Sequence, residues 1–74
     1  MATLGSRFKE LREKAGKTQR EMAEILNHKT TRQVQRIEAD ESTLDSKQIV
    51  MLADYFGVST DYLLGRTDDP TFNK

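Results

Sequence analysis

The sequence has no cysteine, a single proline and a single histidine among its 74 residues. Without cysteine, neither a disulfide framework nor a thiolate metal site is available, so a small core must be held by helix packing or by a partner chain. No stretch approaches the roughly 20 apolar residues of a membrane-spanning helix, and the N-terminus lacks the apolar run of a signal peptide. With 35% hydrophobic residues, the chain is predicted to form one small cytoplasmic domain with no membrane partner.

The net charge is zero, with 12 basic and 12 acidic residues. Taken alone, this balance argues against a polyanionic partner, because neutralising phosphates requires an excess of basic side chains. The charges are unevenly distributed, since residues 1–36 carry nine bases and four acids, a net of +5, and the remaining residues a net of −5. The chain is therefore predicted to present one basic half, unless the split is an accident of a short sequence.

Apolar residues recur at intervals of three and four, which is typical of amphipathic helices, and no stretch alternates as a strand would. The intervals predict five short helices, over approximately residues 5–15, 19–26, 31–38, 46–56 and 60–64. The predicted fold class is therefore all-α, a compact five-helix bundle over residues 1–65. Residues 66–74 are predicted to be a tail or the start of a linker, because they contain the proline and no apolar period.

The predicted helix ends carry recognisable capping residues. Thr18 and Glu21 form a capping box at the start of the second helix, and Asp45 or Ser46 is expected to cap the fourth. Gly57 follows the fourth helix, where a left-handed residue commonly ends a helix. Only a short turn separates the second and third helices, and this is the arrangement of a helix-turn-helix.

The third predicted helix lies in the segment NHKTTRQVQRIEADES, residues 27–42, and its apolar side is formed by Val34 and Ile37. Because each helical residue advances about 100° around the axis, four side chains point roughly 90° to 170° away from that side. They are Thr31, Arg32, Gln35 and Arg36. Arginine pairs bidentately with guanine and glutamine with adenine, so this face is suited to reading bases. A solvated helix face also favours these residue types, and both interpretations stay open at this point.

The candidate DNA-binding residues lie on the third helix, on the turn before it and at the start of the second helix. They are Gln19, Lys29, Thr30, Thr31, Arg32, Gln33, Gln35 and Arg36. Gln19 is included because the free N–H groups at a helix start attract phosphate.

No constellation of catalytic or metal-binding residues is evident. His28 is interpreted as a polar turn residue, because no cysteine or acid stands beside it at ligand spacing. No serine, lysine or acid accompanies it in the pattern of a nucleophile and its base. We therefore predict no enzymatic activity, no metal, no cofactor and no small-molecule ligand.

The ordered segments RFKELREKAGKTQREMAEIL, VQRIE and IVMLADYFGVSTDYLLG resemble the Xre and phage Cro/CI repressor family of helix-turn-helix proteins, over roughly residues 7–65. The resemblance implies a lambda-repressor-like DNA-binding domain of a transcriptional regulator, most often a repressor. It also implies a homodimer on an operator of double-stranded DNA with two half-sites. Carried over by position, it makes Gln19 a phosphate clamp, and Thr31, Arg32 and Arg36 the main base contacts.

The same resemblance implies that Arg12 pairs with Glu38, where the alternative is two flank charges facing water. It places Tyr62 and Leu64 at an outward edge where two copies meet, with ordinary surface packing as the alternative. The chain departs from the family in the turn, which has one residue more than usual and Asn27 in place of glycine. Asparagine tolerates the left-handed conformation, so a turn is still predicted.

A different class of function also fits the composition. A protein-interaction module on the same fold, such as an antitoxin or an adaptor, agrees with the zero net charge. The outward arginine and glutamine side chains of the third helix favour DNA binding instead.

Overall fold

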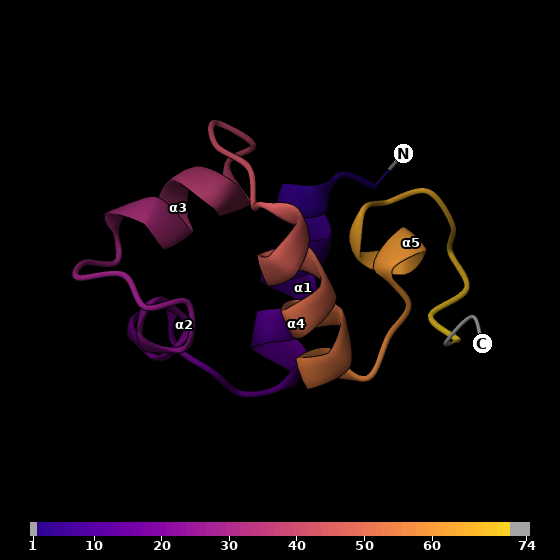
Figure 1. Cartoon of the computed structure of the whole chain (residues 1–74), viewed down its shortest axis with the longest axis horizontal. Coiled ribbons are helices and arrows are strands. Elements are labelled where there is room, and N and C mark those ends of the chain that lie inside the picture. The colour runs from indigo at the N-terminus through magenta and orange to yellow at the C-terminus, as the bar shows by residue number, and fades with distance from the viewer. Residues whose placement is uncertain (1, 72–74) are drawn as a thin grey trace.

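The computed structural model describes residues 2–71, and the regular structure in this range consists of five α-helices without a strand. They are α1 (Leu4–Lys14), α2 (Gln19–Ile25), α3 (Arg32–Glu38), α4 (Ser46–Phe56) and α5 (Thr60–Leu63). In Figure 1, α2 and α3 lie to one side of α4, and α5 lies to the other. The predicted all-α five-helix fold is confirmed, with each helix end within one residue of its predicted position.

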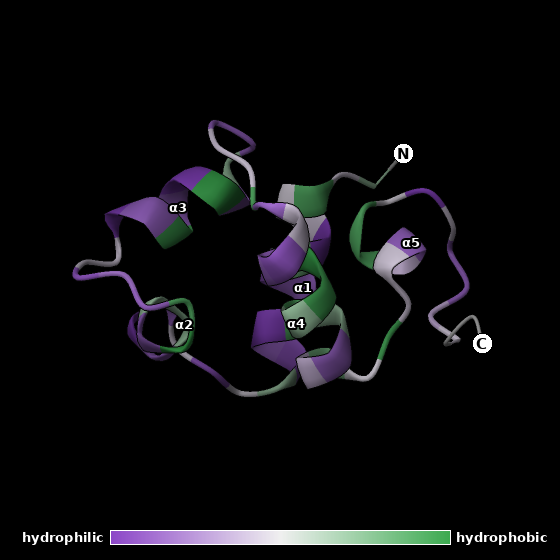
Figure 2. Ribbon diagram, in the orientation of Figure 1, coloured by the Kyte–Doolittle hydropathy of each residue, from purple (hydrophilic) through white to green (hydrophobic). Residues whose placement is uncertain are grey.

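The core is formed by the apolar sides of all five helices. Its largest fully buried side chains are Phe8, Met22, Val34, Ile37, Leu52 and Leu63. Figure 2 shows hydrophobic and hydrophilic residues alternating along α3 and α4, as expected of helices that are half-buried. Leu44 packs into the core from the loop before α4, whereas Ala15, at the C-cap of α1, is exposed.

The predicted caps are present. The Thr18 hydroxyl accepts from the Glu21 N–H, and the Glu21 side chain accepts from the Thr18 N–H. Asp45 and Gln48 form a second such box at the start of α4, and Gly57 ends that helix in the left-handed conformation with φ 71°. These capping interactions are local in the sequence, which is why the helix ends could be predicted from it.

The start of α1 approaches the end of α3 closely, and no sequence pattern predicted this contact. Asp40, at φ 60°, accepts hydrogen bonds from the Gly5 N–H at 2.9 Å and the Thr3 hydroxyl at 2.7 Å. A Cβ atom on Gly5 would lie 2.5 Å from the Ile37 carbonyl oxygen. Glycine is therefore required here by the close approach of two backbones.

The segment after α5 runs back along the bundle as far as residue 71. The Ser59 N–H donates to the Pro70 carbonyl at 3.1 Å, and Asp68 lies 2.5 Å from the buried guanidinium of Arg7. The Asp68 side chain is 98% exposed, so this pair adds little stability. The rest of the predicted tail, residues 72–74, lies outside the described residues.

None of the helices within residues 2–71 is long and apolar enough to span a membrane.

Candidate nucleic-acid interface

The outward face of α3 carries exposed polar side chains opposite the buried side of the helix. Val34 and Ile37 turn inward, with exposed fractions of 0% and 1%, while Arg32, Gln35 and Arg36 are exposed. The predicted orientation of these three side chains is therefore confirmed. Thr31, at the edge of the same face, is half-buried.

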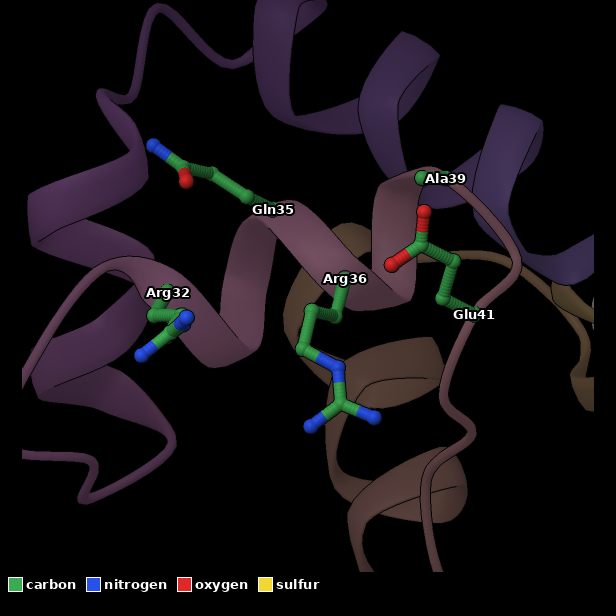
Figure 3. Close-up of a pocket in the computed structure, with 5 residues that line it drawn as sticks. All are labelled: Arg32, Gln35, Arg36, Ala39 and Glu41. Atoms are coloured by element: carbon green, nitrogen blue, oxygen red, sulfur yellow. The ribbon is translucent and has the colours of Figure 1, made fainter.

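Arg32, Gln35 and Arg36 border a shallow hollow of about 560 Å³, together with Ala39 and Glu41 (Figure 3). The Glu41 N–H donates to the Arg36 carbonyl at 2.8 Å, which holds the loop after α3 beside the end of the helix. The helix face itself has no acid, but Glu41 brings a carboxylate to its C-terminal edge. Because a carboxylate repels phosphate, the face is most cationic toward Arg32.

A chain of polar side chains lies behind this face and joins α1, α2 and α3. The Arg12 Nε donates to a Glu38 carboxylate oxygen at 2.6 Å, and the two side chains are only 12% and 6% exposed. The other Glu38 oxygen accepts from the Gln19 amide at 3.1 Å. The pairing of Arg12 with Glu38 is confirmed, and the alternative of two solvated flank charges is wrong.

Gln19 extends this chain to the exposed face. Its amide oxygen accepts from the Gln35 amide at 3.3 Å, so Glu38, Gln19 and Gln35 follow one another from the interior to the surface. The Gln19 side chain is half-buried and its amide is oriented by Glu38. The structure thus places Gln19, at the start of α2, directly beside Gln35 on α3.

The turn between α2 and α3 runs from Leu26, the C-cap of α2, to Thr31, the N-cap of α3. Asn27 adopts the left-handed conformation with φ 62°, which asparagine tolerates, and Lys29 and Thr30 are exposed. The Thr31 side chain makes no capping bond at the start of α3, because its backbone is helical rather than extended. The Thr30 hydroxyl accepts a hydrogen bond from the Arg32 N–H at 3.4 Å, which is long and therefore weak.

Gln33 lies at the flank of α3, about 70° around the helix axis from the inward direction set by Val34 and Ile37. Its amide donates to the Ser42 hydroxyl at 2.7 Å and its side chain is half-buried. This candidate therefore faces the loop before α4 and is not one of the residues that line the hollow beside Arg32 and Arg36.

The predicted outward orientation of Tyr62 is wrong. Its side chain is part of the core, since the residue is only 8% exposed, and its hydroxyl donates to Glu10 at 3.2 Å. The guanidinium of Arg7 covers the ring at 3.8 Å from its centre. A helix of four residues has no apolar period long enough to define its inward side, which explains the error. Leu64, the other expected edge residue, is half-buried.

The first turn of α2 carries one acidic residue, Glu21, beside the positive end of the helix dipole. Hydrogen bonding from the Thr18 backbone N–H lowers the pKa of Glu21 below its ordinary value of 4.5.

Within residues 2–71, no cluster of three or more potential metal ligands occurs.

Comparison with known proteins agrees with this geometry. Residues 8–63 match the helix-turn-helix family. Over 66 residues, covering 89% of the chain, the sequence is 42% identical to the HTH-type transcriptional regulator ImmR of Bacillus subtilis (strain 168). The matched region is 51% of that protein, so the chain spans about half the length of this curated relative.

Proposed function

The chain belongs to the Xre and Cro/CI-type helix-turn-helix family, and from this premise we propose that it binds double-stranded DNA sequence-specifically and regulates transcription as a repressor. It acts as a binding protein and not as an enzyme. In this proposal residues 1–65 are the DNA-binding domain.

The observation that carries the proposal is the exposure of Arg32, Gln35 and Arg36 on a helix whose opposite side is buried. A helix of this kind, preceded by a short turn and a second helix, fits the major groove of B-DNA with its N-terminal residues against the base edges. Arg32 stands at the N-terminus of α3, at the most cationic part of the face. We assign it the principal base contact, with guanine as the preferred partner.

The remaining candidates have supporting roles in the proposed complex. Gln19 and the exposed Lys29 and Thr30 contact the phosphate backbone on either side of the groove, which fixes the position of α3. Thr31 and Arg36 contact bases or the adjoining backbone. Gln35 is oriented by Gln19 and reads a base from the middle of the face.

Two copies are proposed to occupy one operator. In this arrangement two copies of α3 enter successive major grooves, about 34 Å apart, and the operator has two related half-sites. A dimer also doubles the number of phosphate contacts that the basic side chains can make.

A protein-interaction module is the second candidate function. It is favoured by one observation, the exposure of Val50, Met51 and Tyr55 on α4, because exposed apolar groups often mark protein interfaces.

Selection of bound duplexes from a random pool separates the two candidates. We expect enrichment of a two-fold related sequence, and affinity for it should fall steeply as salt rises, because phosphate contacts release counterions. A pool that shows no enrichment, together with no retardation of random duplex at low salt, would refute DNA binding and favour the interaction module.

A further inference from the structure

The exposed side of α4 carries an apolar centre with a charge at each end. Val50, Met51 and Tyr55, with exposed fractions of 52%, 37% and 44%, are the large hydrophobic residues that stand exposed in the described part of the chain, and all three belong to α4. Lys47 and Asp54 are exposed on the same helix, three residues before Val50 and three after Met51. At about 100° per residue, Lys47, Val50, Met51 and Asp54 share one side of α4, and we call these four residues the α4 stripe.

The α4 stripe lies opposite the buried side of its helix. Leu52 and Ala53 are packed in the core with 0% and 1% exposure, so α4 is already held in place without using the stripe. All four stripe residues, with Ser46, line a hollow of about 550 Å³. An apolar centre with charged ends is the anatomy expected of a protein interface.

The order of residues along the stripe makes it complementary to itself. When two copies of α4 pack antiparallel about a two-fold axis between residues 50 and 51, Lys47 of each copy lies opposite Asp54 of the other. Val50 and Met51 of both copies then meet around the axis. Parallel packing would oppose Lys47 to Lys47 and Asp54 to Asp54, which is unfavourable. A two-fold interface requires this kind of self-complementary patch.

We propose that the α4 stripe binds a second copy of this chain, through an antiparallel pair of α4 helices held by two symmetry-related ion pairs between Lys47 and Asp54. The inference deepens the proposed function, because it names the surface that would join the two copies on an operator. It also replaces the edge at Tyr62, whose side chain is buried. A helix of 11 residues is about 16 Å long, so the contact is smaller than a standard interface and the free dimer is weak.

Charge exchange tests the pairing in the DNA-free protein. Sedimentation equilibrium at low salt should show weak self-association of the wild type, weakened about tenfold by Lys47→Glu or Asp54→Lys, because each single reversal sets like charges opposite one another twice. The double variant Lys47→Glu/Asp54→Lys should associate as the wild type does, since both pairs are restored with opposite sign. Val50→Asp should abolish association, and Lys9→Glu, at an exposed position on α1, should not change it.

A double variant that associates no better than the single variants would overturn the antiparallel pair. Wild-type protein that remains monomeric at every concentration would refute binding of a second copy to the α4 stripe. A different polypeptide would then be the partner of this surface. Association that survives Val50→Asp would place the contact on a different face and equally refute the proposal.

Binding to DNA provides an independent measurement. On a duplex with both selected half-sites, binding should be cooperative for the wild type and for the double variant, but not for Val50→Asp, and a single half-site should bind all of them equally. Equal cooperativity of Val50→Asp would refute the stripe while leaving DNA binding intact. Failure of every variant to bind DNA would refute the proposed function, whereas the sedimentation results would still decide the pairing.

Discussion

Arg12 and Glu38 form a nearly buried ion pair that joins α1 to α3, with 2.6 Å between the Arg12 Nε and the Glu38 carboxylate. Arg12 also donates to the Lys17 carbonyl at 2.9 Å, so the guanidinium holds the connection before α2 as well. Charges withdrawn from water depend on one another, because either one alone would be left without solvation. The pair therefore fixes the position of the helix that carries the proposed base-reading face.

Replacing Glu38 by alanine should destabilise the fold strongly. The substitution leaves the guanidinium of Arg12, whose side chain is only 12% exposed, without its carboxylate, and we expect the free energy of unfolding to fall by about 3 kcal/mol. Urea denaturation followed by circular dichroism measures this change. Glu38→Gln, which retains an acceptor for Gln19, should cost less than Glu38→Ala. A loss below about 1 kcal/mol for the alanine variant would show that the pair is solvated in solution.

Gly5→Ala should destabilise the protein, although alanine normally favours a helix by up to about 1 kcal/mol over glycine. The added Cβ would lie 2.5 Å from the Ile37 carbonyl oxygen, so α1 and α3 must move apart. We expect a net loss of about 1 to 3 kcal/mol, as for other overpacked sites. Thermal unfolding provides the measurement, with Lys9→Ala at an exposed position of the same helix as the control. Stabilisation by Gly5→Ala would mean that α1 and α3 are far enough apart to admit the added Cβ atom.

Much of the fold follows from patterns that are local in the sequence. The inward direction of α3 could be predicted from Val34 and Ile37, because two apolar residues three apart define one side of a helix. The capping box at Thr18 needs only the residue three positions later. The exposure of Arg32 then follows from helix geometry alone.

Other features depend on contacts between distant segments, so no local pattern reveals them. Asp40 binds the start of α1, 35 and 37 residues earlier in the chain, and the requirement for glycine at position 5 arises from that same approach. Glu41 reaches the edge of the α3 face only because the following loop turns back beside the helix. The phase of the four-residue helix α5 is set by packing, which is why the burial of Tyr62 was missed.

Acid should weaken the start of α2 through Glu21. Its pKa is lowered in the folded chain, chiefly by the hydrogen bond from the Thr18 N–H, so its stabilising effect is present above the ordinary value of 4.5. That effect is lost as the pH falls through the lowered value. Thermal unfolding at a series of pH values below about 6 should show a smaller loss of stability for Glu21→Gln than for Glu24→Gln, which removes an exposed carboxylate from the same helix. Identical pH profiles would refute a role for this carboxylate.

Arg32→Ala should reduce affinity for the selected duplex by about 1 to 3 kcal/mol and relax the base preference at one position. The motive is the exposure of Arg32 at the N-terminal end of α3, opposite the core. Fluorescence anisotropy titrations with the selected duplex and with single base-pair substitutions measure both effects. Arg66→Ala removes the same charge from an exposed position in the C-terminal segment and should leave the preference unchanged. Binding by Arg32→Ala that equals the wild type would exclude the proposed contact.

Gln19→Ala should reduce affinity for selected and random duplexes to a similar extent, because a phosphate contact carries no sequence information. The substitution also removes the amide oxygen that orients Gln35, at 3.3 Å. Any further loss of affinity for the selected duplex, beyond the loss common to both duplexes, should be the smaller of the two. Anisotropy titrations with both duplexes at two salt concentrations should show the same salt dependence as the wild type, because glutamine is uncharged and its removal changes no counterion release. Urea denaturation of the variant shows whether the fold is destabilised by the loss of the Gln19–Glu38 hydrogen bond. We expect little change in the free energy of unfolding, because Glu38 retains Arg12 as its partner. A loss confined to the selected sequence would instead make Gln19 a determinant of base preference and refute the phosphate contact.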